Sequence, residues 1–357
     1  MEKVRVMLHR DQMKNKRSGF KPWRLGGTIA LLLLATACGS QAAPTAGPVN
    51  GQEGKAPAGA YPRTIVTGGK HEVVVPAKPE RIAALSLDTA EMALELADPS
   101  RFVVAPRSLD NEQLSVHAEQ GKLIGTKITG ATKLDPEQVL SYKPDLVLMT
   151  TIHDGERDAD PILKQAGIPV LTFKEWGTVR QIMDQLNLIG QALGEEEKAK
   201  AVTDRMKGKL DAARNKVEER KAVSKPTVLV LSPVGPNTGP YMMGPDNISS
   251  DLVRLAGGMP AAEAMGLPRT TKATIEQIIQ ADPDCILLSD WEGKKEQAFR
   301  ELTGNPGWST LKAVKEGRVR VMAAKQLVNA NPAVVDSIAE IADVLESASG
   351  VKKEAGA

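Results

Sequence analysis

The chain has 357 residues, with 46 Lys/Arg against 44 Asp/Glu and a formal net charge of +2. Residues 1–37 hold eight of the basic and two of the acidic residues, so the remainder has 38 basic and 42 acidic residues, a net charge of −4. The basic excess therefore belongs to the N-terminus. A body that carries a net negative charge gives no case for nucleic-acid binding.

The N-terminus has the pattern of an export signal. A basic region from Lys14 to Arg24 precedes an apolar run from Leu25 to Ala37. That run has 13 residues, fewer than the ~20 that a membrane-spanning helix needs. Residues 1–37 are therefore predicted to be a signal peptide, and Met13 is an alternative start.

Cys38 directly follows the small residues that end this run. The segment resembles a bacterial lipobox, in which such a cysteine is lipidated, although Ala35 stands where leucine is preferred. We expect a lipid anchor on Cys38 at the outer face of the cell membrane, which is periplasmic in a two-membrane bacterium. An ordinary secreted protein is the alternative. Residues 38–62 are rich in Gly, Ala and Pro and are predicted to form a flexible tether.

Two stretches of the body echo each other at an offset of 139 residues. One runs from Glu137 to Leu148 and the other from Glu276 to Leu287. Each is predicted to be a short helix, a Pro-Asp break and a buried apolar strand. A unit used twice indicates two similar lobes with a cleft between them.

The rest of the body alternates strands with helices, which predicts a mostly parallel sheet in each lobe. Asp88 is expected to cap a helix, with Glu91 completing a capping box. Asp135 followed by Pro136 is a second helix start. We predict an N-terminal lobe over 63–194, a C-terminal lobe over 224–350 and a disordered tail over 351–357. Cys285 falls within an apolar strand and is expected to be a small buried hydrophobe.

A long amphipathic helix is predicted between the lobes, over residues 195–223. Its apolar positions step by three and four residues: Ala199, Val202, Met206, Leu210, Ala213 and Val217. At ~1.5 Å per residue, such a helix is long enough to run from one lobe to the other. A charged surface helix without a special role is the alternative.

These pieces together resemble the substrate-binding lipoproteins of ABC importers, most closely the branch that binds ferric siderophores, haem and cobalamin. The resemblance covers residues 63–347 and is carried by four motifs in the family's order. They are Pro79-Glu80-Arg81-Ile82-Ala83, Lys143-Pro144-Asp145-Leu146-Val147, Leu255-Ala256-Gly257-Gly258, and Asn305-Pro306-Gly307-Trp308 with Glu316-Gly317-Arg318-Val319. It implies an α/β fold of two Rossmann-like lobes joined by one long α-helix, with the ligand in the cleft and only slight closure.

The resemblance also implies partners. Family members dock on a permease through one glutamate on each lobe, and the matching positions are Glu137 and Glu276. The partners are then an ABC permease with its ATPase subunits, and the binding protein is expected to be monomeric. The alternative is that each glutamate only complements a helix dipole, an effect of about 0.3–1 kcal/mol.

The cleft is expected on the loops that follow the strands. Arginines there suit an anionic ferric complex, and aromatic side chains suit its organic shell. The candidate ligand-binding residues are Arg107, His153, Trp176, Tyr241, Met242, Arg269 and Trp291. The preferred ligand is a ferric siderophore, a small-molecule iron complex whose identity the sequence does not specify.

Haem and cobalamin are the alternatives within the same transporter class. At the positions where haem-binding relatives place Met and His ligands, this chain has Ile128 or Thr129 and Asp290 or Trp291, which are poor iron ligands. His153 or Met242 could serve as the iron ligand instead. The reasoning leaves cobalamin open because it needs no protein ligand. No spacing of His, Asp and Glu resembles a zinc or manganese site, so no metal site and no cofactor are predicted.

An enzyme on the same fold is the alternative from a different class. The sequence has no Gly-x-Gly-x-x-Gly after an opening strand, no phosphate-binding loop and no Gly-x-Ser-x-Gly elbow. We therefore predict no catalytic residues. A sensor that uses the same fold is not separated from a transport protein by the sequence.

Overall fold

A computed structural model describes residues 60–68, 71–174, 176–219, 224–233 and 239–348. Some predicted features lie outside these residues: the signal peptide, the lipidated Cys38, most of the tether, and the C-terminal tail. No helix in the described part of the chain is both long and apolar enough to cross a membrane.

The first lobe contains a parallel sheet with the strand order β5-β4-β3-β6-β7. The register pairs Ile82 with Leu146, and Val147 with Val170. An antiparallel hairpin, β1 with β2, precedes this sheet. The strands are β1 (Arg63–Thr67), β2 (His71–Val75), β3 (Ile82–Ala84), β4 (Phe102–Pro106), β5 (Lys127–Ile128), β6 (Leu146–Thr150) and β7 (Val170–Phe173).

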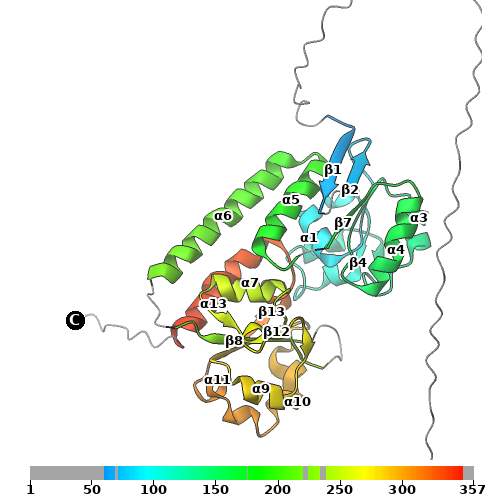
Figure 1. Cartoon of the computed structure of the whole chain (residues 1–357). Helices are drawn as coiled ribbons and strands as arrows, with labels where there is room; N and C mark the ends of the chain where they lie inside the picture. Colours follow the sequence, from blue (N-terminus) through cyan, green and yellow to red (C-terminus); the bar gives the residue numbers. More distant parts are fainter. Residues whose placement is uncertain (1–59, 69–70, 175, 220–223, 234–238, 349–357) are drawn as a thin grey trace, which may run out of the picture. The chain divides into compact units, whose positions relative to one another are not determined.

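Helices connect these strands and cover the sheet, as the cyan and green elements of Figure 1 show. The α-helices are α1 (Leu87–Leu94), α2 (Ala118–Lys122), α3 (Pro136–Ser141), α4 (Asp154–Gln165) and α5 (Val179–Leu193), and the 3₁₀ turns are η1 (Pro99–Arg101) and η2 (Arg107–Asp110). The N-cap of α1 is Ser86, so Asp88 lies within the first turn and does not cap it. The predicted capping box is wrong because Glu91 is fully buried and accepts hydrogen bonds from residues 115 and 116.

The second lobe has the strand order β11-β9-β8-β12-β13, with β10 beside β8. Strands β8, β12 and β13 are parallel, whereas β9 is antiparallel to both β8 and β11. The strands are β8 (Thr227–Ser232), β9 (Tyr241–Met242), β10 (Met259–Pro260), β11 (Thr271–Lys272), β12 (Cys285–Asp290) and β13 (Val319–Ala323). Cys285 is buried in β12, and burial raises the pKa of its thiol to about 11, as expected for an inert core residue.

Short helices surround the second sheet. They are α7 (Ile248–Leu255), α8 (Ala261–Ala264), α9 (Ile275–Ala281), α10 (Arg300–Thr303), α11 (Lys312–Lys315), α12 (Ala324–Leu327) and α13 (Ser337–Glu346), with η3 (Lys295–Phe299), η4 (Trp308–Thr310) and η5 (Pro332–Asp336). The last of these, α13, is preceded directly by the 3₁₀ turn η5 and becomes α-helical only at Ser337.

The sequence echo corresponds to a structural repeat. Lys143 and Asp282, which are 139 positions apart, both adopt positive φ angles, of 50° and 33°. Two residues further on, Asp145 accepts the backbone N–H of Arg81 at 2.9 Å, and Asp284 accepts that of Thr227 at 2.8 Å. Each aspartate thereby holds the start of the strand next to its own, which explains the Pro-Asp pattern in both lobes.

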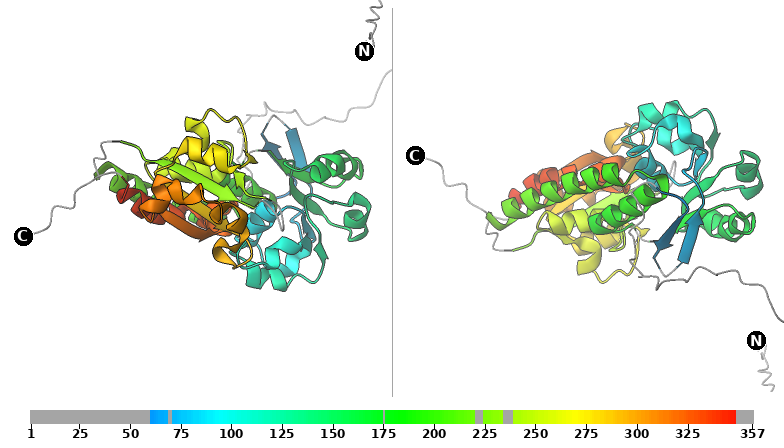
Figure 2. Two further views of the ribbon diagram at one scale, coloured as in Figure 1. Left: turned by 90° about the horizontal axis from the view of Figure 1, so that it is seen from below. Right: turned by 90° about the horizontal axis from the view of Figure 1, so that it is seen from above.

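One helix, α6 (Glu196–Glu219), connects the two lobes. It packs against α5 at one end and against α7, η5 and α13 of the second lobe, as Figure 1 shows. The two views of Figure 2 show the first sheet (cyan to green) and the second sheet (yellow to red) as separate units. The predicted α/β fold, with two mostly parallel sheets and one crossing helix, is confirmed.

Candidate ligand-binding cleft

The carboxyl ends of the two sheets face each other. Asn111, after β4, donates from Nδ2 to the backbone oxygen of Trp291, after β12, at 3.1 Å. The backbone N–H of Lys325, after β13, donates to the backbone oxygen of Gln113 at 2.9 Å. These bonds join loops at the strand ends where parallel sheets place their ligands. The seam between the lobes is therefore the candidate cleft.

A second group of contacts lies beyond β7. The backbone N–H of Val179 donates to the Asp251 carboxylate at 2.9 Å. A Cβ atom at Gly177 would lie 2.4 Å from the backbone oxygen of Asp246, so only glycine fits there. The lobes thus touch through backbone atoms on this side as well. A hydrophobic core cluster also includes residues of both lobes, among them Leu114, Trp176, Met243 and Ala330.

The first lobe's edge is organised by a buried carboxylate. Glu156 is fully buried and accepts hydrogen bonds from the hydroxyl groups of Ser86, after β3, and Thr150, at the end of β6. It also accepts the backbone N–H groups of Ile152 at 3.0 Å and His153 at 3.1 Å. Burial alone would raise the pKa of Glu156, but these donors and the His153 ring outweigh it, and the pKa is lowered. The loop after β6 is therefore held by an ionised group.

His153 lies on this loop, with its side chain 49% exposed and Nδ1 at 3.4 Å from a Glu156 oxygen. This contact is the largest cause of the raised pKa of His153. Nε2 is the ring nitrogen not engaged by Glu156. Arg107, the first residue after β4, is exposed, and its side chain forms no ion pair or hydrogen bond within the described part of the chain.

On the second lobe, Tyr241 pairs with Ser232 at the carboxyl end of β8 and with Lys272 on β11. Both Tyr241 and Lys272 therefore lie at the facing edge. The Lys272 side chain extends toward Gly239, where a Cβ would lie 3.2 Å from its Cε atom. Lys272 is exposed and unpaired within the described residues. Sequence reasoning missed it, because a two-residue strand gives no periodic signal.

Two other predicted residues of this lobe lie differently. Arg269 is exposed but comes three residues before Lys272, a distance of roughly 10 Å along the chain and away from the edge. A Cβ at Gly244 would meet its backbone, which places Arg269 beside the far end of β9. Met242 is 1% exposed and packs in the core below the edge. The Met242 side chain is therefore not offered to a ligand at the seam.

The two tryptophans predicted to bind ligand, Trp176 and Trp291, both contact other residues of the protein. Trp176 is 6% exposed and packs edge-on against Phe173, with ring centroids 5.6 Å apart. Trp291 is half-buried, and its Nε1 donates to the Ser232 hydroxyl at 2.9 Å. Of the two, Trp291 is the one that retains exposed surface at the facing edges. Asp290 beside it accepts backbone N–H groups of its own loop.

Glu137 and Glu276 occupy equivalent places in the repeat. Each is exposed in the first turn of a short helix, α3 or α9, behind an N-cap: Asp135 for α3 and Thr274 for α9. Asp135 and Pro136 form the predicted helix start. The pKa of Glu276 is lowered, first by its own backbone N–H and then by the Thr274 hydroxyl.

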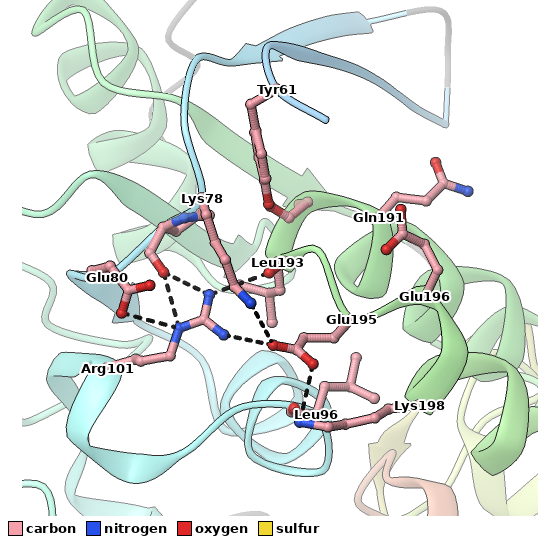
Figure 3. Close-up of polar contacts among 12 residues, drawn as sticks. Tyr61, Lys78, Glu80, Leu96, Arg101, Gln191, Leu193, Glu195, Glu196 and Lys198 are labelled. Atoms are coloured by element: carbon pink, nitrogen blue, oxygen red, sulfur yellow. Dashed lines mark hydrogen bonds and ion pairs between the residues drawn. The ribbon is translucent and has the colours of Figure 1, made fainter. Parts of the chain in front are cut away.

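The corner between α5 and α6 holds the crossing helix in place (Figure 3). Glu195 accepts from Arg101 and Lys78 at 3.1 Å and pairs with Lys198 at 3.0 Å. Arg101, whose side chain is 10% exposed, also donates to the backbone oxygens of Pro79 and Leu193. These bonds fix the start of α6 to the first lobe.

Two surface hollows lie away from the seam. One, of about 520 Å³, is lined by the β1–β2 hairpin and β7, including His71, Val74 and Lys164. The other, of about 570 Å³, lies between α8 and α9. Both lie away from the carboxyl ends of the strands, so the seam stays the candidate cleft on the ground of sheet topology. No group of His, Cys, Asp and Glu side chains in the described residues has a metal-binding arrangement.

Two α/β lobes with facing strand ends and a single crossing helix define a two-lobed solute-binding protein. A family model described as periplasmic binding protein matches residues 82–325, and the chain belongs to this family. The relatives that match this chain are substrate-binding transport proteins and not enzymes.

Individual relatives agree with this assignment. An ABC transporter substrate-binding lipoprotein of Bacillus subtilis, YvrC, is 27% identical over 288 residues, which are 79% of this chain and 85% of that protein. The structure of the heme-binding protein BhuT with two hemes is 25% identical, with a TM-score of 0.64, over 76% of this chain and 99% of that one. An ABC-type Fe³⁺-hydroxamate transport protein of Saccharomonospora viridis is 22% identical, with a TM-score of 0.64, over 80% of this chain and 99% of that one.

Proposed function

We propose that this protein captures an anionic iron complex outside the cell, with a ferric siderophore preferred, and delivers it to an ABC permease. The observation that carries the proposal is a pair of exposed cations, Arg107 and Lys272, on the two facing edges, whose side chains form no ion pair within the described residues. Tyr241 and Trp291 lie at the same edges and offer aromatic surface to the organic shell of the ligand. Relatives whose names refer to heme and to Fe³⁺-hydroxamate transport support an iron complex.

The ligand class is tested by tryptophan-fluorescence titration of the full chain in detergent micelles. The panel contains ferric catecholates, ferric hydroxamates, ferric citrate, haem and cobalamin. We expect quenching by an anionic ferric complex at submicromolar concentration, because Trp291 lies at the seam. No quenching by any ferric siderophore would contradict the proposal.

The chain offers matched variants for this titration. Arg107→Gln and Lys272→Gln are each expected to weaken binding about tenfold, since a charge-assisted contact to a ligand is worth about 1.5–3 kcal/mol. Arg269→Gln removes another exposed cation, three residues before Lys272 and beside the far end of β9, and it should change affinity less than about twofold. Equal losses of affinity in Arg269→Gln and Lys272→Gln would contradict the proposal that Lys272 contacts the ligand.

Haem is the second candidate, and one observation favours it. The Glu156 carboxylate holds Nδ1 of His153, which leaves Nε2 as the nitrogen that could meet a metal. Sequence reasoning gave no pair of axial ligands, so this candidate ranks second. A Soret shift with submicromolar haem that is lost in His153→Gln would place haem first.

We further propose that Glu137 and Glu276 dock the two lobes on the permease. Their equivalent, exposed positions suit a membrane partner that is itself a pair. The double variant Glu137→Arg with Glu276→Arg should abolish cellular uptake of the iron complex while leaving its affinity unchanged. Glu301→Arg, at an exposed site on α10, is the matched control and should transport normally. Full transport by the double variant would refute this role.

A further inference from the structure

Trp291 follows β12 of the second lobe, and two of its polar groups are bound from opposite lobes. Its backbone oxygen accepts a hydrogen bond from Nδ2 of Asn111, in the first lobe, at 3.1 Å. Its indole Nε1 donates to the hydroxyl group of Ser232, in the second lobe, at 2.9 Å. The side chain is half-buried and packs against the hydrophobic cluster that includes residues of both lobes. Protein groups therefore set its orientation, while part of its surface remains exposed.

The loop that carries Trp291 is fixed as well. The Asp290 side chain accepts three backbone N–H groups of this loop, at distances between 2.9 and 3.2 Å. Asp290 itself is only 6% exposed. Gly293 has a positive φ angle of 72°, and a Cβ atom there would lie 3.7 Å from Nε2 of Gln113 in the first lobe. The loop after β12 is therefore shaped by its own hydrogen bonds and lies against the loop after β4.

Asn111, the first-lobe partner of Trp291, is held by its own turn. Its Oδ1 accepts the backbone N–H of Gln113 at 2.8 Å. Its backbone oxygen accepts the N–H groups of Leu114 at 3.0 Å and Ser115 at 2.9 Å. The amide nitrogen of the side chain is thereby aimed across the seam. Asn111 acts as a positioning residue for Trp291.

A second aromatic residue and a cation lie on the same face of the second sheet. Tyr241 is directly opposite Ser232 on β8 and Lys272 on β11, and both pairs are antiparallel. Side chains directly opposite each other in antiparallel strands share one face of the sheet. The Ser232 hydroxyl, which binds the Trp291 indole, therefore lies on the face that carries Tyr241 and Lys272. With strands about 4.8 Å apart, Ser232 and Lys272 are separated by roughly 10 Å.

This group of side chains has a definite chemical preference. Aromatic side chains stack on flat rings, and a lysine ammonium group attracts negatively charged oxygens. Lys272 is exposed and forms no ion pair within the described residues. A ring that carries negatively charged oxygens at its rim can meet both kinds of group at once. Citrate and alkyl hydroxamate complexes offer oxygens without such a ring.

We propose that Trp291 is a preset platform for an aryl ring, so that the iron complex bound in the cleft is a ferric catecholate. Asn111 positions this platform from the opposite lobe, and Tyr241 and Lys272 complete the subsite for the ring and its oxygens. The inference rests on the proposed function and goes beyond it by naming the chelating group of the ligand and the residue that selects it.

The test compares two metal complexes that differ mainly in the ring. Chromium(III) tris-catecholate and chromium(III) tris-oxalate carry the same negative charge, chelate through paired oxygens and exchange their ligands slowly. Their affinities for the full chain in detergent micelles are measured by isothermal titration calorimetry. We expect the tris-catecholate to bind about tenfold more tightly. Trp291→Leu should lower this ratio of affinities about fivefold, whereas Trp291→Phe, which keeps an aromatic face, should lower it less than about twofold.

Asn111→Asp tests the positioning role. It keeps the oxygen that accepts from Gln113 and replaces the donor to Trp291. We expect the ratio of affinities to fall about threefold and the near-ultraviolet circular dichroism of the tryptophans to change. Tyr142→Leu is the matched control, because Tyr142 is a half-buried aromatic residue at the end of α3, before the start of β6. It should leave the ratio unchanged.

The outcomes separate this inference from the proposed function. Equal affinities for the two complexes, or a ratio that Trp291→Leu leaves unchanged, would overturn the inference and leave the proposed function standing. If Trp291→Leu does not fold, Trp291→Val serves with the same expectation. Tighter binding of haem than of the tris-catecholate would assign the platform to a porphyrin and overturn the catecholate assignment. Absence of binding by every ferric complex of the fluorescence panel would overturn the proposed function and this inference together.

Discussion

Two carboxylates, Glu195 at the α5–α6 corner and Asp88 at the start of α1, have opposite surroundings. At the α5–α6 corner, Glu195 faces Arg101, Lys78 and Lys198, and although burial raises its pKa, hydrogen bonds from Lys198 and Lys78 lower it by more. At the start of α1, burial raises the pKa of Asp88 to about 7, and the charges of Glu156 and Glu91 add to the rise. The corner is a permanent joint held by ion pairs. The start of α1 instead disfavours a negative charge.

The largest expected effect is at the corner. Arg101→Met removes a buried cation and leaves Glu195 and the backbone oxygens of Pro79 and Leu193 short of a donor. We expect a loss of about 3 kcal/mol in the free energy of unfolding, measured by urea denaturation. Lys78→Met, which removes a side chain that is 48% exposed, should cost less than ~1 kcal/mol. Equal losses would show that the corner is an ordinary surface ion pair.

An intermediate effect is expected at the first lobe's edge. The buried Glu156 carboxylate accepts hydrogen bonds from Ser86, Thr150 and the loop backbone. Glu156→Gln keeps the shape of the side chain but replaces one of its acceptor oxygens with an NH₂ donor. We expect a loss of about 1–2 kcal/mol in the free energy of unfolding. The variant should also lower the pKa of Asp88, measured by carboxyl NMR, because the neighbouring negative charge is removed. An unchanged pKa of Asp88 in this variant would show that the charge of Glu156 does not act on Asp88.

The last expected effect, from Asp88→Asn, has a size that depends on pH. The folded pKa of Asp88, about 7, is above its ordinary value of 3.8, so ionisation destabilises the folded state as the pH rises from about 4 through 7. The variant should therefore be more stable than the parent chain at pH 8.5 and about equal to it at pH 4, as measured by urea denaturation at the two pH values. Glu195→Gln should show the reverse trend, with a loss that disappears as the pH falls below the pKa of the unfolded carboxyl group.

Much of the fold followed from the sequence because its signals are local. The repeated Pro-Asp break predicted the two lobes, and the matching φ angles of Lys143 and Asp282 show the same corner in each. The amphipathic stripe predicted the crossing helix. The Asp135-Pro136 start was also correct, since it depends only on capping within one turn.

The cleft was harder to predict because its residues are brought together by tertiary contacts. Lys272 reaches the edge through an antiparallel ribbon of two-residue strands, whereas Arg269, three positions earlier, does not. Glu91 looked like a capping residue, but the chain at Ser115 covers it and uses it as a buried acceptor. Neither outcome is encoded in local spacing.

The assignment of the cleft is tested most directly by hydrogen exchange of the full chain with and without a ferric catecholate. The account predicts that the ligand slows exchange in the segments that contain Arg107, His153, Tyr241 and Trp291, on both lobes together. Slower exchange only in the β1–β2 hairpin and β7, which line the hollow of about 520 Å³, would contradict the account.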